Sequence, residues 1–177
     1  MTTLTPPETE LVVLLDDAGT PIGTADKSVV HGADTPLHLA FSCHISDGDG
    51  RFLVTRRALG KLAFPGVWTN AVCGHPAPGE PMEDAVRRRA RYELGLELGE
   101  LELVLPEFRY RAADASGTVE NEVCPVFVTQ VHTDPNPDPA EVVEWIWVDQ
   151  GMLRTAVRAT PFVFSPWLVE QLEEWPG

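Results

Sequence analysis

Turns that begin with Asp and end with Gly separate pairs of strand-like segments, and this pattern most limits what the chain can fold into. Asp and Gly tolerate the backbone angles that hairpin turns require. The turns lie at residues 16–19, 47–50 and 114–117, and the strand-like segments at residues 11–26, 39–46, 51–57, 101–112, 118–131 and 141–148. The sequence therefore predicts an extended sheet built largely from hairpins.

Helix signals are fewer. A helix is expected over about residues 81–94, because Pro81 suits a first helical position, Glu83 and Asp84 complement the helix dipole, and Gly95 stops it. Shorter helices are expected at residues 150–158 and 167–175. Residues 65–79 contain so many Pro and Gly residues that we expect a loop there, neither helix nor regular strand. These elements predict an α+β fold.

Composition sets the class of protein. The 177 residues, 44% of them hydrophobic, suit one domain with its own core. The net charge of -14 disfavours nucleic acid and anionic membranes as partners. There is no apolar run of membrane-spanning length and no sign of a signal peptide, and the 3 cysteines form no CxxC pair. We expect a cytoplasmic monomer.

Histidines and glutamates form a possible metal site. His31 and His38 flank a short loop, and His75 follows a cysteine in the segment rich in Pro and Gly. Glu120 and Glu122 alternate on a predicted strand, so their carboxylates face one side, about 6.6 Å apart at the backbone. Such a set suits a divalent transition metal. The spacing alone leaves open ordinary loop histidines and a solvated strand face.

One segment resembles the Nudix box of metal-dependent diphosphate hydrolases. That box reads Gly-x5-Glu-x7-Arg-Glu-U-x-Glu-Glu-x-Gly-U, with U an aliphatic residue. This chain reads Gly74-x5-Glu80-x7-Arg88-Arg89-Ala90-x-Tyr92-Glu93-x-Gly95-Leu96. The register matches, but Arg89 and Tyr92 replace metal-binding acids of the family, and only Glu93 of the central cluster remains. A hydrolase altered in this way should hydrolyse poorly.

Further motifs resemble those of the type I isopentenyl-diphosphate isomerases, which share the Nudix fold and have a similarly degraded box. The resemblance covers about residues 10–167 and implies a Nudix-like mixed β-sheet sandwiched between helices. It implies one domain over residues 1–177, with an N-terminal segment at 1–38 that supplies His31 and His38, and the degraded box at 74–96. The motifs are Thr55-Arg56-Arg57-Ala58, Pro65-Gly66-Val67-Trp68-Thr69-Asn70, Cys73-Gly74-His75-Pro76, Phe108-Arg109-Tyr110-Arg111 and Glu120-Asn121-Glu122-Val123-Cys124-Pro125.

The resemblance implies a set of binding residues. It implies Mn²⁺, Zn²⁺ or Mg²⁺ at a site made by His31, His38, His75, Glu120 and Glu122. It also implies that a further Mg²⁺ travels with the substrate diphosphate and meets Glu93. The expected substrate is a small prenyl diphosphate. Its diphosphate would bind Lys27, Arg57, Lys61 and Arg89, which supply the local positive potential that the acidic composition lacks.

The same resemblance implies the catalytic groups. Cys73 and Glu122 would transfer protons on opposite faces of the alkene as isopentenyl and dimethylallyl diphosphate interconvert in isoprenoid biosynthesis. Tyr110 would assist Glu122, and Trp167 would stabilise a passing carbocation with its π face. On sequence alone, Tyr110 could equally be a buried strand aromatic and Cys73 a buried inert thiol. The other cysteines, Cys43 and Cys124, are expected inside strands of the core.

Two other functions remain open from the sequence. A Nudix diphosphohydrolase would share the loop–helix Mg²⁺ site, although it would need more acidic residues than Glu80 and Glu93. A non-enzymatic diphosphate or metal sensor could use the same scaffold. We also expect that the N-terminal segment orders when substrate binds, since its loop holds two expected ligands.

Overall fold

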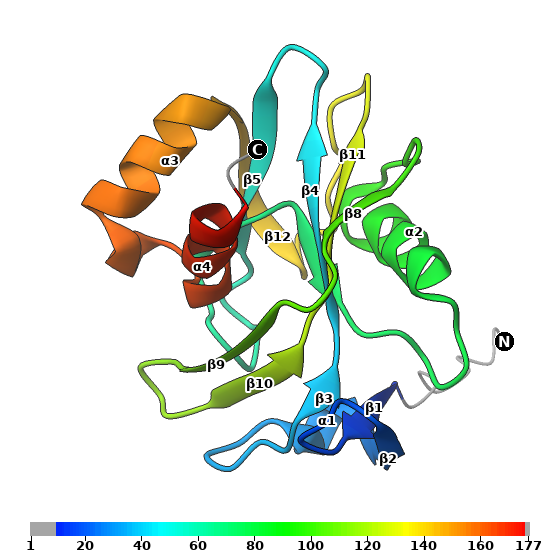
Figure 1. Ribbon diagram of the computed structural model, residues 1–177. Coiled ribbons are helices and arrows are strands. Elements are labelled where there is room, and N and C mark those ends of the chain that lie inside the picture. Colours follow the sequence, from blue (N-terminus) through cyan, green and yellow to red (C-terminus); the bar gives the residue numbers. More distant parts are fainter. Residues whose placement is uncertain (1–9, 176–177) are drawn as a thin grey trace, which may run out of the picture.

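The computed structural model describes residues 10–175. Residues 1–9 and 176–177, which belong to the expected 1–38 segment and to the ends of the expected 1–177 domain, lie outside the described residues. Within residues 10–175 the chain forms two sheets and a few helices in one α+β domain. Figure 1 shows the larger sheet upright in the centre, with the smaller sheet below it.

Each expected hairpin turn is present, and an aspartate stabilises each one. The carboxylate of Asp16 accepts the backbone N–H groups of residues 18 and 20, that of Asp47 those of residues 49 and 51, and that of Asp114 those of residues 116 and 118. These side chains imitate a backbone turn. The glycines that close the turns, Gly19, Gly50 and Gly117, have φ of 81°, 84° and 88°. Non-glycine residues rarely adopt such angles.

The smaller sheet has the strand order β2-β1-β3-β10-β9. β3 and β10 are parallel, and the other neighbours are antiparallel. Glu122 pairs in register with His38 on one side and with Tyr110 on the other. The strands are β1 (Leu11–Leu15), β2 (Pro21–Asp26), β3 (His38–Leu39), β9 (Arg109–Ala113) and β10 (Val119–Val123).

The larger sheet has the order β12-β5-β4-β11-β8, with β6 paired to β5 and β7 paired to β4. Only the β4–β11 pair is parallel. The strands are β4 (Phe41–Ser46), β5 (Arg51–Arg57), β6 (Trp68–Thr69), β7 (Val72–Gly74), β8 (Glu102–Leu105), β11 (Val126–Gln130) and β12 (Val142–Asp149). The expected mixed sheet is thus confirmed, and it is divided into two.

Two expectations about strands were wrong. The segment 65–79 is not free of regular strand, because β6 and β7 form there and extend the larger sheet. The segments 39–46, 101–112 and 118–131 are not single strands, since each one breaks and continues in the other sheet. Pro106 and Pro125 lie at the second and third of these breaks. Proline has no N–H to give to the ladder, so pairing ends there.

Four α-helices and one 3-10 helix complete the described residues. The expected helix forms as α2 (Met82–Leu94), with Pro81 at the N-cap and Gly95 left-handed at φ 64°. Ser165 caps α4 by accepting the N–H of Leu168. The other helices are α1 (Lys27–Val30), α3 (Gln150–Ala159), α4 (Pro166–Glu174) and the 3-10 helix η1 (Pro161–Val163), of which α1 and η1 were not expected.

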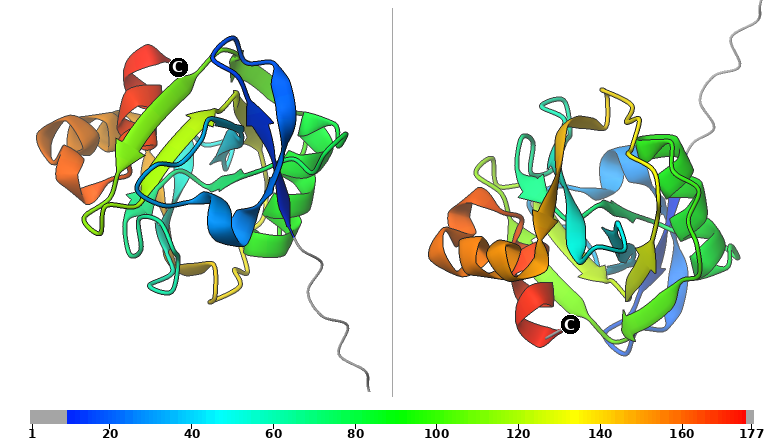
Figure 2. Two further views of the ribbon diagram at one scale, coloured as in Figure 1. Left: turned by 90° about the horizontal axis from the view of Figure 1, so that it is seen from below. Right: turned by 90° about the horizontal axis from the view of Figure 1, so that it is seen from above.

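Helices cover both sides of the larger sheet. Both views in Figure 2 place α2 and the α3–α4 pair on opposite sides of the strands. α2 packs Val86 and Leu94 against Phe41 and neighbouring strand residues, while α3 and α4 pack Leu153 and Leu168 on the other face. The expected sandwich is confirmed. No described helix has the length and apolar character to span a membrane.

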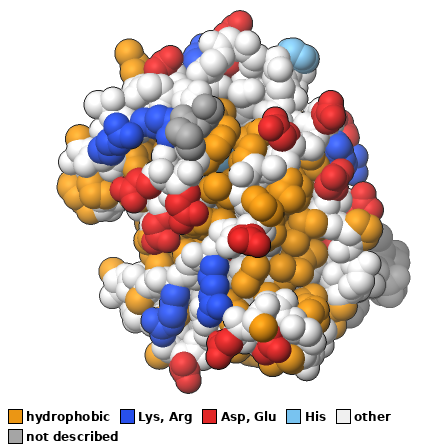
Figure 3. Space-filling model, in the orientation of Figure 1, with side chains coloured by type: hydrophobic (Ala, Val, Ile, Leu, Met, Phe, Trp, Pro, Cys, Tyr) orange, Lys and Arg blue, Asp and Glu red, His pale blue; other side chains and the backbone are white. Residues whose placement is uncertain are grey.

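Hydrophobic and charged side chains share the surface. On the face shown in Figure 3, hydrophobic side chains form a band through the middle, and acidic and basic side chains are scattered around it. The acidic excess of the composition is therefore not confined to one patch of this face.

Candidate functional site

A cavity of about 540 Å³ lies where the two sheets meet Glu10, α1 and α2. It is lined by nearly all of the side chains that the sequence analysis named as site residues. His38 is the exception, because it is fully buried behind the wall. The lining residues among those named are Lys27, His31, Arg57, Lys61, Cys73, His75, Arg89, Glu93, Tyr110, Glu120, Glu122 and Trp167.

At one end of this cavity lies the histidine–glutamate cluster, which we define as His31, His38, His75, Glu120 and Glu122. One ligand atom from each of the three histidines and from Glu122 lies within 4.8 Å of the others. The Nε2 atoms of His75 and His38 are 3.0 and 3.4 Å from Glu122 Oε1, and His31 Nε2 is 3.0 Å from Glu120 Oε2. The structure thus brings together the three histidines and Glu122, and Glu120 adjoins this group through His31.

The cluster has the features of a metal site. Among the described residues, the buried side-chain atoms without a hydrogen-bond partner are His31 Nε2, His38 Nε2, His75 Nδ1 and Glu120 Oε2, all of this cluster. Buried polar atoms without partners are costly unless something binds them. His38 Nδ1 lies 2.9 Å from the carbonyl of Pro36, a hydrogen bond that leaves Nε2 with a lone pair facing the cluster. The residues present therefore fit a divalent cation.

Glu122 connects the cluster to the cavity. Burial would raise the pKa of its carboxyl, but the neighbouring imidazoles of His38 and His75 hold that pKa well below its usual range. Its second oxygen, Oε2, accepts a hydrogen bond of 2.8 Å from the hydroxyl of Tyr110. Burial raises the pKa of Tyr110 well above its usual value, so this hydroxyl keeps its proton. Glu122 is thus a buried carboxylate with a fixed orientation.

Cys73 lies on β7 at the wall of the same cavity. The expectation that it occupies an irregular loop was wrong, although its side chain does reach the cavity. Its Sγ is 3.2 Å from Ser42 Oγ and 3.2 Å from Asn70 Oδ1. Burial raises the pKa of the Cys73 thiol to about 11, while the hydrogen bond with Ser42 acts in the opposite direction. The sulfur is therefore a protonated thiol near neutral pH.

The other cysteines are in the core, as expected. Cys43 lies in β4 and is fully buried. Cys124 is also buried, but it lies between β10 and β11 and not inside a strand, which corrects the expectation. Pro125, which follows it, interrupts the ladder at this point.

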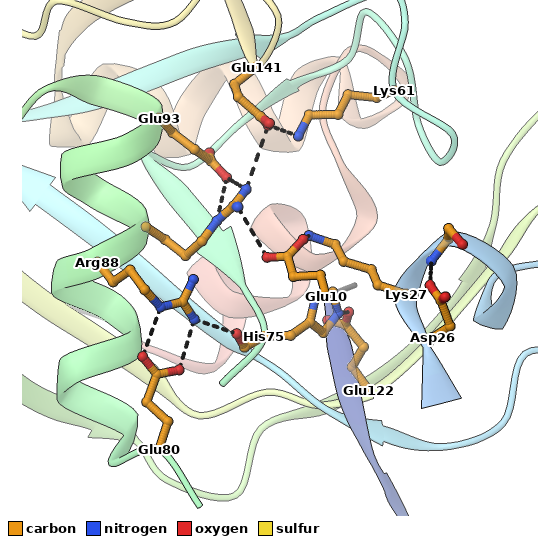
Figure 4. A network of polar contacts seen from close by, with 12 residues as sticks. Glu10, Asp26, Lys27, Lys61, His75, Glu80, Arg88, Glu93, Glu122 and Glu141 are labelled. Atoms are coloured by element: carbon orange, nitrogen blue, oxygen red, sulfur yellow. Dashed lines mark hydrogen bonds and ion pairs between the residues drawn. The ribbon is translucent and has the colours of Figure 1, made fainter. Parts of the chain in front are cut away.

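The four expected diphosphate-binding cations line the cavity, and carboxylates pair with three of them. Figure 4 shows Lys27 beside Glu10 and Lys61 beside Glu141. Arg89 pairs with Glu93, lies 3.4 Å from Glu10 and lies 3.6 Å from Glu141. Burial lowers the pKa of Lys61 to about 8. Sequence reasoning missed Glu10 and Glu141, and no motif marked either of them.

Arg57 is held differently from the other cations. Its guanidinium donates hydrogen bonds to the backbone carbonyls of Ala63 and Phe64 and lies 5.6 Å from the centre of the Trp167 ring. Trp167 is 2% exposed, and its indole N–H donates to Asn70 Oδ1 at 3.0 Å. Tyr110 lies beside the same ring, with centroids 5.5 Å apart. An aromatic wall thus adjoins the thiol.

In the segment that resembles the Nudix box, the charged residues pair with one another and do not form a cluster of carboxylates. Arg89 Nε donates to Glu93 Oε1 at 3.1 Å, one turn further along α2. Arg88 makes two hydrogen bonds with Glu80 at 2.8 Å. Tyr92 is 56% exposed on the outer side of the helix. The carboxylate that faces the cavity from α2 is Glu93, already paired with a cation.

The chain is similar to known proteins in sequence. The model of the NUDIX domain matches residues 36–168. The isopentenyl-diphosphate Delta-isomerase of Agromyces mediolanus is 66% identical over 94% of this chain and 81% of its own length. That of Clavibacter michiganensis subsp. michiganensis is 64% identical over 94% of this chain and 86% of its own length.

Solved structures show the same fold at low identity. A crystal structure from Deinococcus radiodurans has a TM-score of 0.74 and 19% identity, over 94% of this chain and 99% of its own. A MutT protein from Methanosarcina mazei has a TM-score of 0.61 and 19% identity, over 78% and 92%. At this identity the likeness concerns the fold alone.

Proposed function

The chain belongs to the NUDIX domain family and, within it, to the isopentenyl-diphosphate Delta-isomerases, and from that premise we propose how its cavity carries out the reaction. It is an isomerase that interconverts isopentenyl and dimethylallyl diphosphate. One observation carries the proposal: Cys73 and Glu122 line a single cavity that basic side chains also line. A thiol and a carboxylate can therefore meet the alkene of a bound diphosphate.

The diphosphate binds Lys27, Arg57, Lys61 and Arg89. Three of these cations are paired with carboxylates, so binding exchanges those partners for phosphate oxygens. The diphosphate does not react, and its binding energy can therefore hold the alkene between the proton-transfer groups. A Mg²⁺ ion accompanying the diphosphate would meet Glu93.

Cys73 and Glu122 are the proton-transfer groups. Isomerisation needs one proton added to one carbon and another removed from a neighbouring carbon, so the acid and the base must both reach the alkene. The site contains one acid and one base, because Cys73 retains its proton and Glu122 is a carboxylate. Tyr110 keeps Glu122 oriented through its hydrogen bond. In the reverse reaction the two groups exchange tasks.

Two features of the cavity suit a cationic intermediate. Trp167 presents a buried π system next to Cys73, and such a face stabilises a desolvated cation by about 2 kcal/mol. Phe64 and Tyr110 pack around the same ring and keep water away from it.

His31, His38, His75, Glu120 and Glu122 hold a divalent metal, which we propose to be Mn²⁺, Zn²⁺ or Mg²⁺. When bound, the cation offsets the repulsion between the two carboxylates and fixes the position of Glu122. The imidazole nitrogens and carboxylate oxygens of this set suit a borderline transition ion.

The hydrolase alternative receives less support. A NUDIX hydrolase needs a cluster of carboxylates on the box helix, and here Arg89 takes one of those positions and pairs with Glu93. The sensor alternative does not require a thiol and a carboxylate in one cavity.

Incubation with isopentenyl diphosphate and Mg²⁺ in D₂O tests the activity. We expect dimethylallyl diphosphate to form and deuterium to enter the prenyl group. Release of phosphate would instead identify a hydrolase, and recovery of unlabelled substrate would identify a sensor.

Substitution tests the proton-transfer residues. Cys73→Ala and Glu122→Gln should each lower kcat by at least about 10²-fold, because each one removes a general acid or base. Cys43→Ala, which removes a thiol from the neighbouring core, is the control and should keep kcat. Full activity in Cys73→Ala would remove this thiol from the mechanism.

We also propose that the protein acts as a monomer in the cytoplasm. The free thiols Cys43, Cys73 and Cys124 support a reducing compartment. Light scattering of the purified chain should give a mass near 19.4 kDa. A mass twice as large would contradict the monomer.

A further inference from the structure

A serine lies directly across the sheet from the proposed proton-transfer thiol. Ser42 on β4 pairs in register with Cys73 on β7, so their side chains stand on the same face. Ser42 Oγ is 3.2 Å from Cys73 Sγ, and Ser42 is fully buried. No motif of the sequence marked this residue.

Behind Ser42, hydrogen bonds continue away from the cavity. Gln171 of α4 places its Nε2 2.9 Å from Ser42 Oγ, and its Oε1 lies 2.9 Å from His44 Nε2. Gln171 is fully buried, and His44 is 1% exposed. Because no solvent reaches these atoms, the hydrogen bonds between them determine which atom donates and which accepts.

The donors in this chain of hydrogen bonds all point toward the sulfur. Gln171 Nε2 has only hydrogens to offer, so Ser42 Oγ accepts from it. Ser42 Oγ also accepts a weak bond of 3.6 Å from the thiol of Cys124. With both lone pairs occupied, the hydroxyl proton of Ser42 remains to be donated, and Cys73 Sγ is the acceptor in reach.

His44 donates to Gln171, so its hydrogen bond runs in the same direction as those of Gln171 and Ser42. Since the amide nitrogen of Gln171 serves Ser42, its carbonyl oxygen faces His44, and His44 Nε2 must carry the proton of that hydrogen bond. Burial lowers the pKa of His44 to about 4, so the imidazole is neutral and its donor is an ordinary N–H. The direction runs from His44 through Gln171 and Ser42 to Cys73.

We propose that Ser42 and Gln171, supported by His44, are positioning residues that orient the Cys73 sulfur and stabilise it after it has given up its proton. This inference rests on the proposed role of Cys73. In that step the alkene π pair forms the new C–H bond, and the S–H pair stays on sulfur as a thiolate. A hydrogen bond from Ser42 is stronger to the thiolate than to the thiol, so it favours the charged state that develops in the reaction.

Asn70 accepts a hydrogen bond from Cys73, whereas Ser42 donates one to it. Its Oδ1 faces Cys73 Sγ at 3.2 Å and also accepts from Trp167 and Thr69. An acceptor can hold the S–H of the resting thiol but gives no stabilisation to a thiolate. Ser42 is therefore the donor to the sulfur on this side.

The test separates binding from chemistry in variants of Ser42. Ser42→Ala should lower kcat by about tenfold to hundredfold, the usual worth of a hydrogen bond to a charged group, and leave KM within about twofold. Ser42→Thr, which keeps the hydroxyl, should recover most of kcat. The matched control is Ser46→Ala, which removes a hydroxyl from the same strand, where it donates to the carbonyl of Thr129.

A second variant removes one donor from the chain of hydrogen bonds without altering β4. Gln171→Met keeps the length of the side chain and removes its donor, so we expect a smaller fall in kcat, about threefold to tenfold, again with KM unchanged. Circular dichroism at the assay temperature gives the folded fraction to which each kcat is referred. A Ser42→Ala or Gln171→Met enzyme with wild-type kcat per folded molecule, or with only KM altered, would overturn the inference.

Cys73→Ala, measured in parallel, shows whether the positioning role of Ser42 and Gln171 fails alone or together with the proposed role of Cys73. If Cys73→Ala is inactive while Ser42→Ala and Gln171→Met are fully active, the positioning inference fails and the role of Cys73 stands. If Cys73→Ala is fully active, the proposed function of Cys73 fails as well.

Discussion

At the scale of single residues, His44 is a titratable group enclosed in the core. It lies beside Phe52 and Trp175, with ring centroids 5.7 and 5.6 Å away, and only Gln171 hydrogen-bonds its Nε2. Burial lowers its pKa to about 4, and the positive charge of Arg154 acts in the same direction. A protonated imidazole has no compensating carboxylate among these contacts.

This predicts a specific loss of stability in acid. The unfolded chain takes up a proton at a pKa of about 6.5, while folded His44 does so only near pH 4. Above pH 6.5 the group contributes nothing to the pH dependence. As pH falls from about 6.5 to 4, it should lower the free energy of unfolding by up to about 3 kcal/mol. Urea unfolding at a series of pH values measures this.

The comparison with His44→Gln isolates the effect of that one group. The difference in unfolding free energy between wild type and His44→Gln should shrink toward pH 4, because the variant has no proton to take up. His132→Gln, a change at an exposed histidine, should follow the wild type. A constant difference between wild type and His44→Gln across this range would contradict the prediction.

At the scale of elements, the contact between β7 and α2 explains the glycine that opens the degraded box. A Cβ added at Gly74 would lie 2.9 Å from Cγ of Arg89 and 3.0 Å from Cζ of Phe41. Such distances require both neighbours to move. Glycine here allows the helix to approach the strand closely enough for Arg89 to reach the cavity.

We therefore predict that Gly74→Ala has two effects. It should destabilise the protein by about 1–3 kcal/mol, the usual range for overpacking, as measured by urea unfolding. It should also raise KM for the diphosphate, because Arg89 is displaced from its place in the cavity. Gly23→Ala is the matched control, since a Cβ there would meet nothing within 4 Å and φ is not in the left-handed region. Unchanged stability and KM in Gly74→Ala would contradict both predictions and show that Arg89 and Phe41 move aside without cost.

At the scale of the whole molecule, the histidine–glutamate cluster connects parts of the chain that are far apart in sequence. Its ligands follow α1, occupy β3, follow β7 and lie on β10. An ion bound there binds only the folded chain, so it should stabilise the entire domain.

Metal addition should accordingly raise the melting temperature. With Mn²⁺ or Zn²⁺ at about 100 times its Kd, the free energy of unfolding should increase by about 2.7 kcal/mol, and EDTA should reverse the change. His38→Ala should abolish the increase, and His132→Ala should keep it. Equal stabilisation of His38→Ala by the metal would place the ion at another site.

Most of the elements could be predicted because their signals are local. The aspartates that start the hairpins, Pro81 and Gly95 at the ends of α2, and Ser165 before α4 act on backbone groups only a few residues away. The short strands β6 and β7 were not predicted, because pairing with β5 and β4 stabilises them and their own residues give no strand signal. The division into two sheets also depends on distant pairing partners.

The site divides in the same way. The sequence by itself determined the type of each chemical group, and its motifs led to the prediction that Cys73, the histidines and the basic residues belong to one site. Only the tertiary structure decided what each group touches: Glu141 beside Lys61, and Ser42 with Gln171 behind Cys73. The physical reason is that capping and turn formation act along the chain. Hydrogen bonding, burial and charge pairing act through space, between residues that only the folded chain brings together.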